Sequence, residues 1–225
     1  MHAGKSLIGF ILLFLFVSSC SDETEPKQVF QNLSPKAHYV GLQSCLTCHS
    51  EVHKTYQYTG MGQSFAPAHQ RFSDADFNVE KAIYEPNSDF YYFPFVKDSL
   101  MYVREFRLNE HGDTIHNRVE RISYIVGSGH HTNSHIVSFN NYLFQAPVTY
   151  YTQEGKWDMA PSFREEGNLR FDRLLDSECI TCHNHFPEHA QGSLNKFPQM
   201  PSGIECERCH GPGRLPLDAI HKGIL

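Results

Sequence analysis

The sequence predicts an α+β fold, in which short helices and loops surround a small inserted antiparallel β-sheet. Two observations support this prediction. The motif CxxCH occurs three times, at 45–49, 179–183 and 206–210, in segments short enough for single helical turns. Between the first and second motifs, residues 77–126 are rich in β-branched and aromatic side chains and are interrupted by turn-forming pairs. The 225 residues would make one domain of ordinary size or two small ones.

The first 19 residues have the pattern of an export signal. Lys5 precedes an uninterrupted apolar run over 7–17, which is too short to span a bilayer. Residues 17–20 then resemble a lipobox, in which the signal peptide is cut before an acylated Cys. A plain signal peptide followed by a chance Cys is the alternative. Because Cys20 alone among seven cysteines lies outside a CxxC pair, we expect a signal peptide over 1–19 and lipidation at Cys20.

An acidic stretch follows the expected anchor. Asp22, Glu23 and Glu25 lie within five residues of Cys20. One interpretation is a solvated tether over 20–37. The other is that the stretch resembles the acidic export signal of surface lipoproteins in Bacteroidota. We expect the protein to be anchored in a lipid membrane outside the cytoplasm, namely the outer membrane. Under the second interpretation it would face the cell surface.

The CxxCH spacing is typical of covalent haem attachment. Two thiols on one helical turn can reach the two vinyl groups of one haem, and the following His lies under the iron. Zinc ribbons use four Cys per site and would leave one pair over, while thioredoxin-like sites and structural disulfides need no His. We therefore expect three covalently bound haem c groups, with proximal iron ligands His49, His183 and His210. The attachment cysteines are Cys45, Cys48, Cys179, Cys182, Cys206 and Cys209.

The β-rich insertion is expected over about 77–160. A helix of the first motif would begin near Ser44, an acceptable N-cap. The aromatic run 90–95 is expected to be a strand packed on both faces, and 127–135 a polar, flexible loop. The strands expected between turn signals are 82–84, 90–95, 100–108 and 114–126, followed by a strand pair over 141–151. The predicted fold is thus short helices and loops around three haems, with the sheet inserted among them.

Charge and motif content exclude other classes. The net charge is −6, from 19 basic and 25 acidic residues, and the basic residues are scattered, so we expect no nucleic acid partner. No Walker, GxSxG or HExxH motif occurs. The apolar fraction of 40% is low for this length. Covalent haems would contribute their own apolar area to the core.

Three further stretches carry a family resemblance: YVG at 39–41, VGSG at 126–129 and CERCHGPG at 206–213. Together with the motifs they resemble multihaem c-type cytochromes of the cytochrome c-552/c-554-like class, closest to exported members from Bacteroidota. The resemblance covers nearly all of 38–221 and implies electron transfer through haems packed near one another. The expected organisation is a signal peptide over 1–19, an acidic tether over 20–37 and a trihaem cytochrome domain over 38–225.

The sixth iron ligands are less determined. Met61 is our first choice for the first haem, and a gap-filling core Met is the alternative. His53, one turn after His49, would project from the proximal side. The class resemblance favours His131, and His135 at i, i+4 could serve another haem. The class often places a ligating His where Pro216 stands here, so His221 substitutes, another loop does, or one haem lacks a protein sixth ligand.

These observations lead to two functional hypotheses. The first is a membrane-anchored trihaem electron carrier outside the cytoplasm, with redox partner proteins or a quinol-linked donor as partners. The alternative is a multihaem oxidoreductase with one open haem, acting on a small nitrogen or sulfur compound. We favour the carrier over an enzyme. The motifs at 179 and 206 are 27 residues apart, which favours adjacent haems.

Overall fold

The structure is a computed structural model that describes residues 30–164, 167–200 and 203–224. The chain divides into two units, Met1–Ala37 and His38–Leu225. The expected signal peptide over 1–19 and the expected lipidation site Cys20 lie outside the described residues. The described part of the first unit contains one short 3-10 helix, η1 (Gln31–Leu33). Among the helices that the structure describes, none has the length and apolar character needed to cross a membrane.

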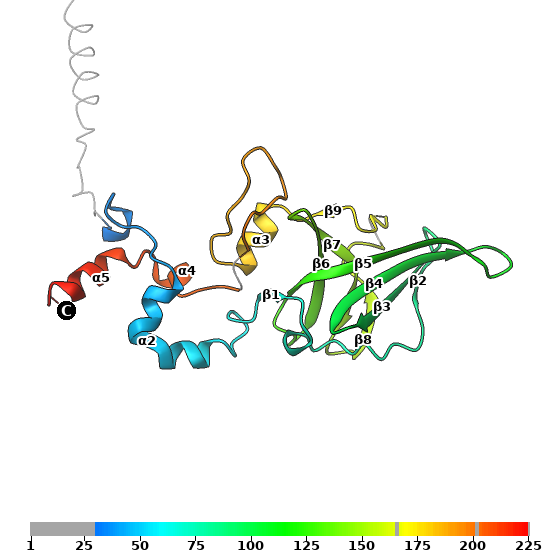
Figure 1. The fold of residues 1–225 in the computed structure, drawn as a ribbon, viewed down its shortest axis with the longest axis horizontal. Helices are drawn as coiled ribbons and strands as arrows, with labels where there is room; N and C mark the ends of the chain where they lie inside the picture. Colours follow the sequence, from blue (N-terminus) through cyan, green and yellow to red (C-terminus); the bar gives the residue numbers. More distant parts are fainter. Residues whose placement is uncertain (1–29, 165–166, 201–202, 225) are drawn as a thin grey trace, which may run out of the picture. The chain divides into compact units, whose positions relative to one another are not determined.

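A nine-stranded antiparallel sheet dominates the described residues of the second unit (Figure 1). The strand order is β2-β3-β4-β5-β6-β7-β8, with β1 paired to β5 and β9 paired to β7. β2 and β8, the two ends of this path, also contact each other, so the sheet curls until it is nearly closed. The strands are β1 (Phe65–Pro67), β2 (Ile83–Glu85), β3 (Phe90–Lys97), β4 (Leu100–Leu108), β5 (Thr114–Val126), β6 (Thr132–Phe139), β7 (Tyr142–Tyr151), β8 (Lys156–Met159) and β9 (Arg173–Leu174).

The predicted fold class, a small sheet inserted among helices around three haems, is therefore wrong. The sheet extends beyond the expected insertion, from Phe65 in β1 to Leu174 in β9. The helices are short: α3 (Ser177–His183) has seven residues and α4 (Glu207–His210) has four. The physical reason is that the curled sheet supplies most of the buried apolar surface, and hydrophobic burial is the dominant favourable contribution to folding.

The aromatic run forms the strand β3, as predicted, but only one of its faces is fully buried, not both as expected. Its inward side chains, including Phe90 and Tyr92, are buried in the core of the curled sheet. Its outward rings instead form cross-strand pairs with β4: Tyr91 stacks on Phe106 with ring centroids 5.1 Å apart, as the register of the two strands places them opposite. Such pairs stabilise a sheet on its solvent face.

The segment expected to be a flexible loop is largely strand. Residues 132–135 begin β6, and Asn133 and His135 are completely buried. The Asn133 amide donates to the Gly127 carbonyl and accepts from the Asp74 backbone N–H. The expected strand pair over 141–151 is the single strand β7, which pairs with β6, β8 and β9. Polar residues on the inward positions hide the alternation that usually marks a strand.

A charged cluster ties the segment after β8 to the inner face of the sheet. Glu105 on β4 is fully buried. Its carboxylate accepts hydrogen bonds from Arg170 Nε and Tyr92 Oη, both at 3.0 Å, and lies 3.0 Å from His116 Nε2. Burial favours the neutral form of Glu105, but Arg170 and the hydrogen bonds from Tyr92 and His116 outweigh it and hold the pKa of this carboxyl below its ordinary value.

Two apolar clusters form the core. The larger fills the curled sheet, and its centre includes Met101, Val103 and Ile122. The smaller joins the sheet to α3, because Ile180 of the second CxxCH motif packs with Phe65 and residues of β6 and β7. The second motif is thus fixed directly on the sheet.

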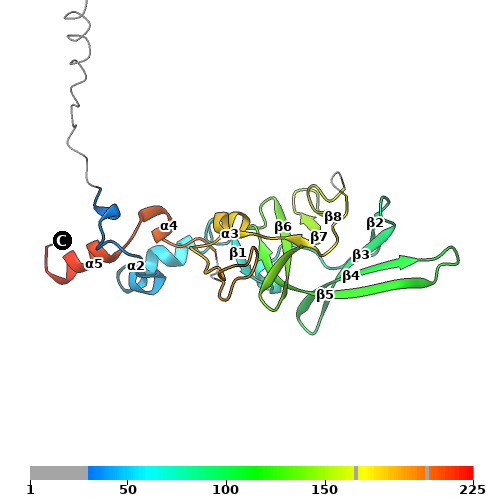
Figure 2. The same ribbon diagram turned by 90° about the horizontal axis from the view of Figure 1, so that it is seen from above.

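The remaining helices are α2 (Leu42–Tyr56), α5 (Arg214–His221) and the 3-10 helix η2 (Gln70–Phe72). Helices α2, α4 and α5 lie side by side in two perpendicular views (Figure 1 and Figure 2). Contrary to the prediction, α2 begins at Leu42 rather than near Ser44. Its N-cap is Gly41, whose φ of 79° is easily adopted by a residue without a Cβ, and the Ser44 hydroxyl donates to the Val40 carbonyl.

Candidate haem site

Each CxxCH motif lies on a helix, as the attachment chemistry requires. Cys45 and Cys48 are one turn apart on α2, and the backbone at the following His49 departs from helical angles (φ −118°, ψ 30°). In α3 the carboxylate of Asp176 caps the helix, accepting from the backbone N–H of Glu178 and Cys179. The six motif cysteines are all free thiols, so none is used in a disulfide.

The Cys45 and Cys179 thiols are not activated as they would be in a redox-active dithiol. Burial raises the pKa of the Cys45 thiol, and the neighbouring Cys206 and Glu207 add to this. Burial, followed by Asp176, likewise raises the pKa of Cys179. Catalytic cysteines instead have lowered pKa values. Cys45 and Cys179 therefore lack the lowered pKa of a thioredoxin-like thiol.

The first and third motifs face one cavity of about 440 Å³. Cys45, Cys48 and His49 line it from α2, and the third motif contributes Cys206, the N-cap of α4, and His210. The rest of its wall is largely apolar, consisting mainly of Val40, Val52, Pro212, Pro216, Leu217 and Ile220. A smaller cavity of about 120 Å³ shares four of these motif residues and adds Leu46, His53 and Tyr56. Apolar walls around paired thiols and a following His are the surroundings that a covalent haem needs, so the residues present fit haem c.

A hydrogen bond connects the third motif to the second. Arg208 of α4 donates to the carbonyl of Thr181 in α3 at 3.3 Å, and this links the third motif to the second. The Ser64 hydroxyl donates to the carbonyl of His183 at 2.7 Å, which fixes the end of α3. Burial lowers the pKa of His183, so its imidazole stays neutral, the form that binds a metal.

The sequence did not single out Glu207, which lies inside the third motif. Its side chain is only 3% exposed. Its carboxylate accepts hydrogen bonds from the backbone N–H of Val40 (3.0 Å), Gly41 (2.8 Å) and Gly213 (2.7 Å). The available signal was the charged pair in CERCH, where the other two motifs carry an aliphatic residue and Thr.

The expected sixth ligands do not line either cavity. Met61 is 58% exposed in the turn after α2. His131 is exposed, with Nδ1 2.7 Å from Gln153 Nε2, and His221 is exposed at the end of α5. His135 is buried against Trp157 inside the sheet. Their roles as iron ligands stay predictions.

His53, set aside as lying on the proximal side, does border the smaller cavity together with His49 and His210. Within the described ranges, no group of three or more His, Cys, Asp or Glu side chains is arranged to hold a bare metal ion.

A family model described as cytochrome c554 and c-prime matches residues 138–211. The match includes the second and third CxxCH motifs, and the first motif lies outside it. No curated protein matches the chain. Among solved structures, the crystal structure of the outer cell wall cytochrome OcwA is similar at 16% sequence identity and a TM-score of 0.49, with 82% of this chain covered.

This chain spans about a third of the length of that cytochrome, since 34% of it is covered. The family match contains two complete attachment motifs. Over residues 138–211 the family match and the repeated motif support a c-type cytochrome with covalently bound haem c as cofactor.

Proposed function

We propose that the protein is a trihaem electron carrier, held outside the cytoplasm by acylated Cys20 and passing electrons between redox partner proteins or from a quinol-linked donor. The observation that carries the proposal is the cavity of about 440 Å³ into which two attachment motifs face. Haems held by those motifs would share one apolar environment. The link from Arg208 to Thr181 brings the third motif against the second.

The chain's own residues have distinct parts in this function. Bound haem supplies reversible one-electron chemistry at its iron. His49, His183 and His210 would each provide a proximal nitrogen. Val52, Leu217 and neighbouring residues give the cavity a largely apolar wall, against which a haem can pack. Low exposure to water and hydrogen bonding near the haem are the levers by which a protein tunes its potential.

The test is a count of haems on the matured chain. Expression with a haem c attachment system, followed by denaturing mass spectrometry, should give the mass of the chain plus three haems. Replacing both Cys179 and Cys182 by Ala should remove one haem and leave two, because the other attachment sites are untouched. A chain that gains no haem, or only two with all six cysteines present, would contradict the trihaem proposal.

The anchor is tested separately. Cys20→Ser should move the protein from the detergent phase to the aqueous phase in a partition experiment, because it removes the acylation site. Digestion of intact cells with an added protease would then distinguish the cell surface from the periplasmic side of the outer membrane. A Cys20→Ser variant that partitions like wild type would refute lipid anchoring.

One observation favours a second function, an oxidoreductase with one open haem acting on a small nitrogen or sulfur compound. Pro216, which stands where the resemblance would place a ligating His, lines the larger cavity. Proline has no ligating side chain. An electron paramagnetic resonance spectrum of the oxidised protein distinguishes the two functions. Only low-spin signals favour the carrier, whereas a stoichiometric high-spin signal that shifts with nitrite, hydroxylamine or cyanide favours the enzyme.

A further inference from the structure

We propose that Glu207 is a positioning residue for the first and third haems: its buried carboxylate holds together the segments that carry their two attachment motifs, and its negative charge lowers the reduction potential of a haem held by one of these motifs. This inference rests on the proposed electron-transfer function. It assigns a role to a side chain that neither binds the haem covalently nor ligates iron.

The contacts of Glu207 join two segments far apart in the chain. Val40 and Gly41 immediately precede α2, which carries the first motif, and Gly213 immediately precedes α5. All three donate their backbone N–H to the same carboxylate. Both carboxylate oxygens accept from these backbone donors, and hydrogen bonds to a charged acceptor are among the strong ones. Glu207 also lies at the N-terminus of α2, where a negative charge is favourable.

Gly213 and Arg214 favour the contact between Glu207 and the segment before α2. A Cβ placed on Gly213 would lie 2.9 Å from Val40 Cγ2 and 3.0 Å from Glu207 Oε1, so the residue at this position must be small. Arg214 extends the same junction, donating from its backbone N–H to the carbonyl of His38 at 3.3 Å and from Nε to His38 Nε2 at 2.9 Å. The segment before α2 is thus held on the α4–α5 turn by several bonds centred on Glu207.

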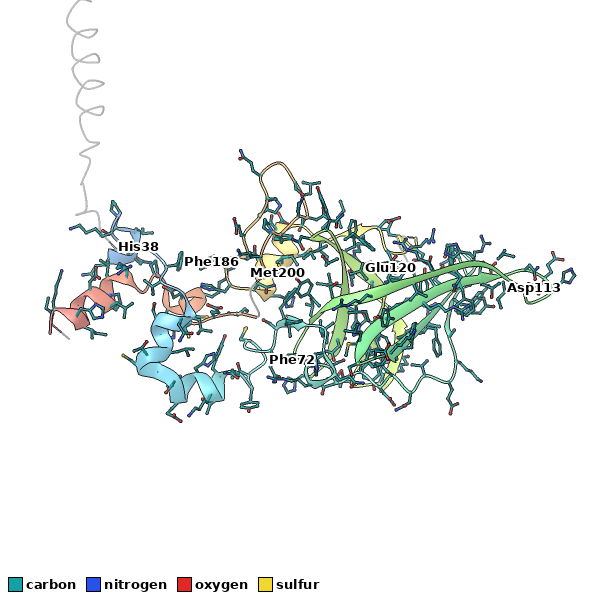
Figure 3. The ribbon with its side chains drawn as sticks, viewed as in Figure 1. His38, Phe72, Asp113, Glu120, Phe186 and Met200 are labelled. Atoms are coloured by element: carbon teal, nitrogen blue, oxygen red, sulfur yellow. The ribbon has the colours of Figure 1, made fainter. Side chains whose placement is uncertain are left out.

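Arg208, the residue after Glu207, connects the third motif to the second. Arg208 reaches the carbonyl of Thr181, and its guanidinium lies 4.9 Å from the centre of the Phe186 ring. Figure 3 shows Phe186 beside α4 and His38 beside the start of α5. Consecutive side chains therefore bind the segment that leads into the first motif and the second motif itself.

The charge of Glu207 has an electrostatic consequence. Within the described residues no Lys, Arg or His forms an ion pair with it, so backbone N–H dipoles provide its compensation. The carboxylate lies in the wall of the larger cavity, along with Cys45, His49 and His210. In a site shielded from water a charge acts more strongly than at the surface. A nearby negative charge stabilises ferric over ferrous iron and lowers the reduction potential.

The experiment is a potentiometric titration of the haem-loaded full chain, comparing wild type with E207Q. The Gln amide has one oxygen, so it cannot accept hydrogen bonds at both of the positions where the carboxylate oxygens accept them, and it carries no charge. We expect E207Q to retain three haems and one haem to titrate at a more positive potential. At its wild-type midpoint the ratio of reduced to oxidised haem should rise about tenfold, which equals about 59 mV for a one-electron couple.

Two matched variants separate the contributions. E178Q removes a carboxylate that is exposed beside Cys179 of the second motif, and solvent screening should leave all three potentials unchanged. E207D keeps the charge and shortens the reach, so its potentials should lie closer to wild type than those of E207Q.

An E207Q protein with three haems and wild-type potentials would overturn the proposal. If E207Q attaches fewer haems, Gly213→Ala tests the positioning role, because it keeps the charge while its Cβ crowds Glu207 Oε1 and Val40 Cγ2. Wild-type haem attachment together with wild-type unfolding stability in that variant would overturn the proposal. A wild-type chain without haem would instead refute the proposed function.

Discussion

His135 allows the most demanding test of the sheet interior. The side chain is completely buried on β6, with its ring centre 4.8 Å from that of Trp157. Neither ring nitrogen has a hydrogen-bond partner among the described residues. Burial lowers the pKa of His135 from 6.5 to about 3, and the nearby Val148 backbone opposes this only in part. In the folded protein His135 therefore stays neutral over most of the acid range.

The magnitude follows from the two pKa values. As the pH falls below 6.5, the unfolded chain takes up a proton at His135 that the folded protein refuses until about pH 3. The contribution to folding stability is complete above the unfolded pKa and is lost as the pH falls towards the folded pKa. The loss is about 1.4 kcal/mol per pH unit, so it reaches about 4 kcal/mol near the lower end of the window.

The perturbation is His135→Leu, which keeps a side chain of similar volume and removes the titrating group. Urea unfolding, followed by far-ultraviolet circular dichroism from about pH 7 to about pH 4, should give a steeper loss of stability for wild type than for the variant. Other titrating groups contribute equally to both proteins and cancel in the difference. Parallel stability curves would refute the reasoning. A new high-spin haem signal in the variant would also refute it, because it would place His135 on an iron.

Three further changes test the packing. Arg170→Leu should destabilise the fold by about 3–5 kcal/mol, because it leaves the buried Glu105 carboxylate without its cation; adding Glu105→Leu should recover most of the loss in the same urea assay, and no recovery would argue against the ion pair. Ile180→Ala should cost about 2–5 kcal/mol while three haems remain attached, as measured by unfolding and haem count. Ser64→Ala should cost about 1 kcal/mol by leaving the His183 carbonyl unpaired; a neutral result would show that water replaces the hydroxyl.

Several strands could be predicted closely. The expected bounds 100–108 and 114–126 are confirmed as β4 and β5, because β-branched and aromatic residues alternate there and turn-forming residues flank them. The strand β6 could not be found in the same way. Its inward positions hold Asn133 and His135, and a polar residue gives no sign in the sequence that a partner elsewhere in the chain will satisfy or cover it.

For the haem motifs, too, the sequence determined some features and the tertiary structure others. The sequence alone determined that three pairs of thiols, each followed by His, occur at haem-attachment spacing, because that chemistry requires only neighbouring residues on one helical turn. Only the tertiary structure decided which motifs meet. The 27-residue spacing favoured adjacent second and third haems, and the fold also brings the first motif to the third around Glu207, whose contact with Val40 joins residues 167 positions apart. A contact between residues so far apart depends on the path of the chain through the curled sheet, and no local sequence pattern encodes that path.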